Sequence, residues 1–184
     1  MPDHITRYDL MPIPPLESQT EYFEAGAVTF GVEYRLLTDA IAAASAVLRA
    51  SGSDSAGGRF DDSGVAIHVF GRDDPASSEA LEYLRFDCFD EDPHYHYVCW
   101  ESRSNEMLHI DPVADGDPLT WALERIRTRL PQMLARAGAS RLASRVDLRL
   151  VEEALPRVSE AAWRARYHHD DASVLAAALA DDVE

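Results

Sequence analysis

Two histidines spaced two residues apart, His94 and His96, are the residues of this 184-residue chain best placed for metal chemistry. Alternate residues of a β-strand point to the same side, so both imidazoles would project together. Asp87 precedes them across an acidic turn, and a hairpin would bring its carboxylate to that side. Two imidazoles and a carboxylate bind non-heme iron(II), or zinc with an open position. The spacing predicts a single divalent metal ion here, with His68 or His109 as a further ligand.

The same sheet face also supports interpretations without a metal. Its further candidates for ligand binding are Tyr83, Arg85, Trp100 and His68. The guanidinium of Arg85 can hold a carboxylate or phosphate through paired hydrogen bonds, which predicts a small anionic ligand. Aromatic residues beside an arginine are also typical of subunit interfaces, which predicts a twofold homodimer. A purely structural explanation is available too, because Asp–His pairs and aromatic rings are common on solvated sheet faces.

Alternating apolar residues predict the strands that would position these side chains. The predicted strands are residues 27–36, 64–70, 81–89, 94–101 and 106–111. The connections among the last four favour an antiparallel meander. A turn over 90–93 would pair Phe89 with His94 and set Asp87 opposite His96. Alternation would then place the apolar residues of these strands on the other face, against helices.

The C-terminal third reads as helical. Asp117 followed by Pro118 is a start signal for a helix, and apolar residues then recur at steps of three and four. Pro131 and Pro156 are expected to kink or interrupt the helices that contain them. Strands first and helices after predict an α+β domain, with an antiparallel β-meander sheet and helices packed on one face.

The remaining segments are assigned from local composition. We treat residues 1–184 as a single domain whose helical part spans 117–180. A proline-rich N-terminal arm, 1–18, is expected to be extended, and an alanine-rich stretch at 40–50 to be helical. The small and polar residues of 51–63 predict a flexible loop.

Composition excludes several classes of function. The chain has 17 basic residues, all arginine, and a net charge of −16. Without lysine, it offers neither a Schiff base nor the lysine of a phosphate-binding loop. The negative charge opposes binding to nucleic acid and to anionic membranes. The arginines of residues 121–170 are expected to neutralise the acidic stretch 52–120, through contacts within the chain or between subunits.

Location and function follow as expectations. The first twenty residues lack the apolar core of a signal peptide, which favours a cytoplasmic protein with reduced cysteines. The arginine- and alanine-rich, lysine-free composition indicates a GC-rich bacterial genome. We expect a ligand-binding or accessory domain that uses the polar sheet face. The alternative is a mononuclear iron or zinc enzyme with Asp87, His94 and His96 as ligands.

Overall fold

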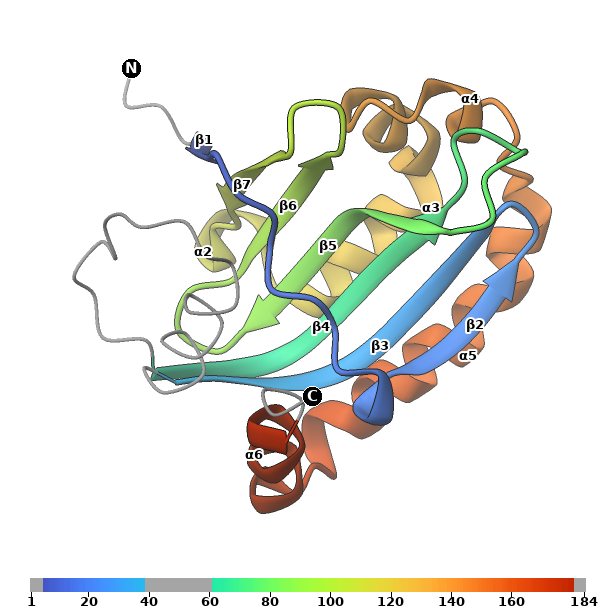
Figure 1. The fold of residues 1–184 in the computed structure, drawn as a ribbon. Coiled ribbons are helices and arrows are strands. Elements are labelled where there is room, and N and C mark those ends of the chain that lie inside the picture. Colours follow the sequence, from blue (N-terminus) through green and yellow to red (C-terminus); the bar gives the residue numbers. More distant parts are fainter. Residues whose placement is uncertain (1–4, 39–60, 181–184) are drawn as a thin grey trace.

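The computed structural model describes residues 5–38 and 61–180, which form a seven-stranded antiparallel sheet with helices (Figure 1). The strands are β1 (Ile5–Tyr8), β2 (Glu21–Ala25), β3 (Val28–Thr38), β4 (Asp61–Gly71), β5 (Leu81–Phe89), β6 (His94–Cys99) and β7 (Ser104–His109). Their order in the sheet is β1-β7-β6-β5-β4-β3-β2. From β2 to β7 each strand pairs with the next in the chain, so the predicted meander and α+β class are confirmed.

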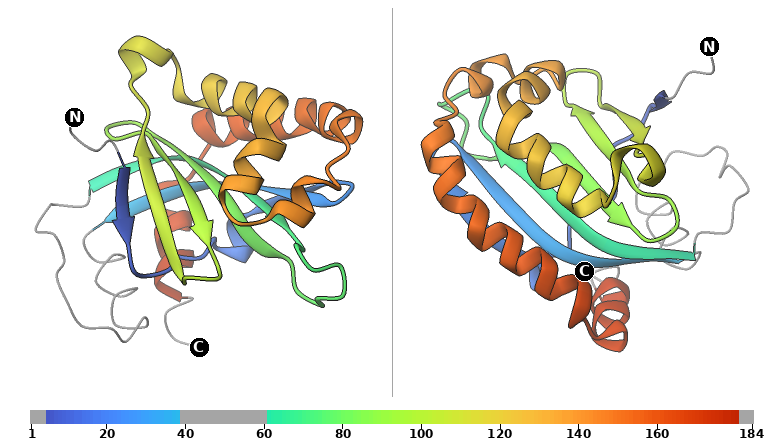
Figure 2. Two further views of the ribbon diagram at one scale, coloured as in Figure 1. Left: turned by 90° about the horizontal axis from the view of Figure 1, so that it is seen from above. Right: turned by 180° about the vertical axis from the view of Figure 1, so that it is seen from behind.

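Among the described residues, the α-helices follow the strands. They are α2 (Pro112–Asp115), α3 (Pro118–Arg136), α4 (Ser140–Ala143), α5 (Leu148–Tyr167) and α6 (Asp171–Ala180), preceded by the short 3-10 helix η1 (Glu17–Gln19). The long helices α3 and α5 cover one face of the sheet, as Figure 2 shows. None of the described helices is long and apolar enough to span a membrane.

The hydrophobic core lies between the sheet and α3 and α5. Alternate residues of β3 and β4, such as Phe30 and Ile67, are fully buried there. They meet Leu119, Ile126 and Leu130, which recur along one stripe of α3. The fold therefore follows two periodicities, two residues in the strands and about 3.6 in the helices.

Three expectations about the elements need correction. Both α3 and α5 continue through Pro131 and Pro156, so neither proline divides its helix. Pro156 has no N–H group to donate to the carbonyl of Glu152, four positions earlier. Both residues are exposed. Water can therefore satisfy that carbonyl, while the buried stripe stays continuous. The predicted 51–63 loop ends earlier, since residues 61–63 belong to β4; residues 51–60 and the helix predicted at 40–50 lie outside the described residues.

Residues 5–18 of the N-terminal arm have a defined course. Within it, β1 pairs with β7 at one edge of the sheet, whereas β2 forms the opposite edge. Residues 9–16, called here the N-terminal segment, cross between these edges on the sheet face opposite α3 and α5 (Figures 1 and 2). The arm is therefore a strand and a crossing segment that covers part of the polar face.

Candidate metal centre

Much of the polar face of the sheet is buried. Nine of its polar or charged residues are at most 9% exposed: Glu33, Arg35, His68, Glu82, Arg85, Asp87, His94, His96 and Asn105. Buried charges are costly unless they are paired or bind a cation. The arrangement of their partners therefore indicates what this face can do.

The β5–β6 hairpin brings Asp87, His94 and His96 to one side, as expected, but in a different register. Asp87 pairs with His94 rather than with His96, a shift of two residues. The turn is wider than expected and is held by a residue of β4. The Asp62 carboxylate accepts hydrogen bonds from the backbone N–H groups of Glu91 and Asp92, at 3.1 and 2.9 Å. Because side chains alternate with a period of two, a two-residue shift leaves Asp87, His94 and His96 on the expected face.

The three side chains converge on a small buried volume. Asp87 Oδ2 lies 3.4 Å from Nε2 of His94 and 3.2 Å from Nε2 of His96. One ligand atom from each residue lies within 4.8 Å of the others. The side chains are 5%, 11% and 10% exposed, in the order Asp87, His94, His96. This geometry is that of a compact ligand set that is nearly closed to solvent.

The other ring nitrogen of each histidine has its own partner. Nδ1 of His94 lies 2.6 Å from the backbone carbonyl oxygen of Asp92, a pure acceptor, so this nitrogen donates. Nδ1 of His96 lies 2.9 Å from Oδ1 of Asn105. With hydrogens on both Nδ1 atoms, neutral imidazoles present their Nε2 lone pairs to Asp87.

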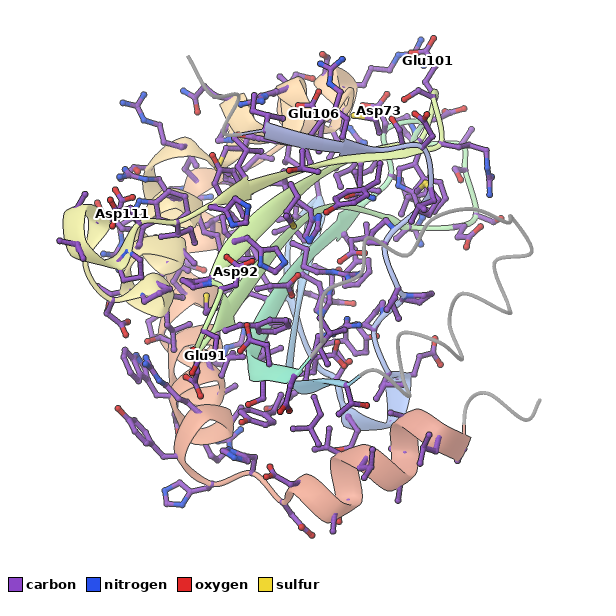
Figure 3. The ribbon with its side chains drawn as sticks, turned by 90° about the vertical axis from the view of Figure 1, so that its left-hand side faces the viewer. Asp73, Glu91, Asp92, Glu101, Glu106 and Asp111 are labelled. Carbon is purple, nitrogen blue, oxygen red and sulfur yellow. The ribbon has the colours of Figure 1, made fainter. Side chains whose placement is uncertain are left out.

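Asp92 contacts two histidines at the edge of this cluster. Its carboxylate lies 2.7 Å from Nδ1 of His109, while its carbonyl accepts from His94. Figure 3 labels Asp92 and Glu91 at the end of the hairpin. His109, the further ligand suggested by the sequence, is thus engaged by Asp92 and lies outside the three-residue cluster.

Electrostatics favour an ionised carboxylate in the cluster. Burial alone would raise the pKa of Asp87, but the contacts with His94 and His96 and the charge of Arg85 hold it well below its ordinary value. Burial also disfavours the charged imidazoles. The pKa of His94 is nevertheless raised, because Asp87 outweighs burial, whereas that of His96 is lowered by burial and by repulsion from His94 and Arg85.

One oxygen of the cluster is unsatisfied. Asp87 Oδ1 is buried and has no hydrogen-bond partner among the described residues. Such orphaned acceptors are rare in folded proteins, because an unmet buried hydrogen-bonding group costs about 1–3 kcal/mol. The Asp87 carboxylate can therefore accept a further hydrogen bond or bind a cation, as can the Nε2 atoms of the two imidazoles.

His68 and Arg85 belong to a neighbouring chain of buried ion pairs. Nδ1 of His68 lies 2.5 Å from Glu82 and its Nε2 lies 3.0 Å from Glu33. Arg85 donates to both carboxylate oxygens of Glu82, at 2.9 and 2.8 Å, and to the Ile13 carbonyl at 2.6 Å. Both ring nitrogens of His68 are thus engaged by carboxylates, and the Arg85 guanidinium already holds an internal carboxylate.

Tyr83 and Trp100 lie elsewhere than expected. A bulge between β4 and β5 pairs Val69 with Leu84 but Phe70 with Glu82, leaving Tyr83 as the extra residue. Tyr83 consequently joins the hydrophobic cluster on the helix side, and Glu82 takes its place on the polar face. Trp100 follows β6, packs against the hydrophobic cluster and donates through Nε1 to the Glu82 carbonyl at 2.7 Å.

Sequence reasoning missed Glu33, Glu82 and Asn105. Glu33 had a visible signal, since it interrupts an apolar strand between Val32 and Tyr34 and must face away from them. Glu82 was hidden by the bulge, which reverses the alternation. Asn105 had no signal of its own, because its role depends on which residues face it across β6 and β7.

The fold and the site define a class: an α+β domain with a seven-stranded meander and a buried cluster of two histidines and one aspartate. Residues 22–162 match the family model described as a domain of unknown function (DUF7700), and the chain belongs to that family. No curated protein and no solved structure matches the chain.

Proposed function

We propose that this protein binds one divalent transition-metal ion through Asp87, His94 and His96 and works as a mononuclear metal protein. The observation that carries the proposal is the convergence of three buried acceptor groups, with one carboxylate oxygen left without a partner among the described residues. Acceptors facing one another repel unless a cation or a proton lies between them.

The spacing of the atoms supports a metal ion. Metal–ligand distances of about 2.1 Å, for zinc with nitrogen or oxygen, imply separations of roughly 3.0–3.5 Å between ligands at 90–110°. The Asp87 Oδ2 separations from His94 and His96, 3.4 and 3.2 Å, fall in this range. They exceed the ~2.7–2.9 Å typical of charge-assisted hydrogen bonds.

A proton accounts for less of the arrangement. One proton on His94 would join that ring to Asp87, but it would leave the Nε2 lone pair of His96 facing the same carboxylate. A cation would satisfy both imidazoles and the carboxylate at once. Partners on each Nδ1 are also the usual outer contacts that orient histidine ligands of metals.

The donor set favours iron(II) or zinc. Two imidazoles with one carboxylate suit both ions and leave coordination positions for water or a substrate. Cys88, next to Asp87 in the chain, points to the other face, where its thiol donates to the Pro118 carbonyl. Burial raises the pKa of this thiol, which further disfavours a thiolate ligand.

The anion-binding alternative has less support. Its central residue, Arg85, is occupied by Glu82 and by the Ile13 carbonyl, and a free ligand would have to displace both. A metal enzyme is thus the better supported alternative, with the open coordination positions as the place of reaction. That the protein works as a homodimer in the bacterial cytoplasm stays a prediction from the sequence.

The experiment that tests the proposal is metal analysis of protein purified without a histidine tag. We expect near one equivalent of iron or zinc in the wild type, after reconstitution where necessary, and loss of it in Asp87→Asn and His96→Gln. His168→Gln is the matched control, because His168 is exposed at the end of α5. Wild-type protein that cannot be loaded, or variants that retain full metal content, would contradict the proposal.

A further inference from the structure

Asn105 connects the candidate metal centre to the N-terminal segment. Its side chain is on β7, and the residue is 2% exposed. Oδ1 lies 2.9 Å from Nδ1 of His96, and Nδ2 donates to the Leu10 carbonyl at 2.8 Å. A single buried amide thus contacts a candidate ligand on one side and a crossing segment of backbone on the other.

The Leu10 carbonyl determines how the Asn105 amide is oriented. A carbonyl can only accept, so the NH2 group of Asn105 must face Leu10 and its oxygen must face His96. That oxygen can only accept in turn, so Nδ1 of His96 carries the hydrogen. Because a neutral imidazole carries one ring hydrogen, its Nε2 is left as a lone pair directed at Asp87.

Resting on the proposed metal-binding function, we infer that Asn105 is a positioning residue that holds His96 in the Nδ1–H form, which leaves Nε2 available as a metal ligand. Without this contact, neutral His96 gains more by placing its hydrogen on Nε2 and donating to Asp87. The lone pair needed for the metal would then be consumed by an internal hydrogen bond.

The N-terminal segment takes part in this positioning. Three buried side chains hold its backbone: Asn105 at Leu10, Arg85 at Ile13, and Glu33, which accepts from the Leu16 N–H at 3.0 Å. The Leu10 carbonyl is therefore placed by neighbouring anchors as well as by Asn105. The N-terminal segment crosses the polar face and thus supports His96 indirectly, through its contact with Asn105.

Two measurements on Asn105 variants test the inference. Long-range proton–nitrogen NMR of the metal-free protein reports which ring nitrogen of His96 carries hydrogen, and competitive titration with zinc reports affinity. We expect Nδ1–H in the wild type, a change to Nε2–H in Asn105→Ala, and zinc affinity about 10–100-fold weaker in that variant. Ser104→Ala, the preceding residue on β7, is the control and should match the wild type in both.

Asn105→Asp separates positioning from a general loss of packing. Its carboxylate still accepts from Nδ1 of His96, so we expect the Nδ1–H form and most of the zinc affinity to return. Affinity as weak as in Asn105→Ala, or Nε2–H in the wild type, would overturn the positioning role. Zinc binding that Asn105→Ala leaves unchanged would overturn only this role, whereas a wild type that binds no metal would overturn the proposed function itself.

Discussion

His68 lies fully buried between two carboxylates, and this arrangement favours its charged form. Burial lowers the pKa of His68, but Glu82 and Glu33 outweigh burial and raise it. Burial likewise opposes ionisation of Glu82, yet Arg85 and His68 lower its pKa from the ordinary 4.5 to about 2. These buried charges are tolerated because each has a partner of opposite sign.

Replacing Glu82 by Gln should therefore be costly. It leaves Arg85 and His68 without their shared carboxylate, and breaking a buried ion pair typically costs about 3–5 kcal/mol. Because the pKa of Glu82 is lower in the folded protein, its carboxylate stabilises the fold above pH 4.5, and this contribution is lost as pH falls toward about 2. Urea unfolding at pH 7 should show the loss, and the variant should lose less stability than the wild type between pH 4.5 and 2.

The control for this prediction is Glu101→Gln. Glu101 is exposed on the turn after β6 and points outward in Figure 3, and its substitution by Gln removes the same charge. It should change the free energy of unfolding by less than about 0.5 kcal/mol. Equal effects of the two substitutions would show that the buried ion pairs contribute no special stability.

At the residue scale, the sequence predicts the candidate ligands but not their partners. His94 and His96 were found because alternation along a strand is a local rule, and Asp87 because a short turn must return the chain. Asn105 and Glu82 are contacts across strands, and their identity depends on register and on a bulge. Neither the register nor the bulge produces a recognisable pattern in the sequence, so these partners could be identified only from the structure.

The element that links the site to the rest of the molecule is the N-terminal segment. It makes no strand pairing of its own between β1 and η1, and side chains of β3, β5 and β7 hold its backbone. A metal that orients His96 would also hold Asn105 and, through it, the Leu10 carbonyl. Metal binding and docking of the segment should therefore favour each other.

Limited proteolysis tests this coupling. Chymotrypsin can cut after Leu10, and cutting requires the segment to leave the sheet. We expect zinc to slow cleavage there about fivefold or more, as coupling of at least 1 kcal/mol implies. Asp87→Asn is the control and should show no effect of zinc. An equal zinc effect in that variant, or none in the wild type, would show that metal and segment are independent.

The helices illustrate how local signals can mislead. Asp117 begins α3 as predicted, with its carboxylate accepting from the Thr120 N–H at 2.8 Å. Pro131 and Pro156 do not end their helices, because the apolar stripes on both sides of each proline pack on the same sheet. Burial along a whole stripe outweighs the loss of one backbone hydrogen bond.

For the whole molecule, the order of strands and helices along the chain predicts the architecture. It does not predict that β1 pairs with β7 or that the N-terminal segment crosses the sheet. Strands followed by helices lead directly to a meander covered on one face. The pairing of β1 with β7 joins residues about a hundred positions apart, and no local pattern announces it. Because β1 pairs with β7, the N-terminal segment has to cross the polar face to reach the opposite edge of the sheet. On that face its Leu10 carbonyl accepts a hydrogen bond from Asn105, beside the candidate metal centre.

Ion pairs also join the helices to the sheet. Arg136 pairs with Glu106 of the acidic stretch at 3.0 Å, as expected from the sequence, whereas Arg164 pairs with Glu21, outside that stretch, at 2.6 Å. These exposed pairs each contribute little to stability. Among the described side chains, the buried acceptor without a hydrogen-bond partner is Asp87 Oδ1, on the polar face.

X-ray absorption spectroscopy of the protein loaded with one equivalent of zinc or iron(II) shows directly which groups bind the metal ion. We expect a coordination shell of nitrogen and oxygen only, with the multiple scattering of two imidazoles from His94 and His96 and an oxygen from Asp87. Sulfur in the shell, fewer than two imidazoles, or failure to form a one-to-one complex would contradict it.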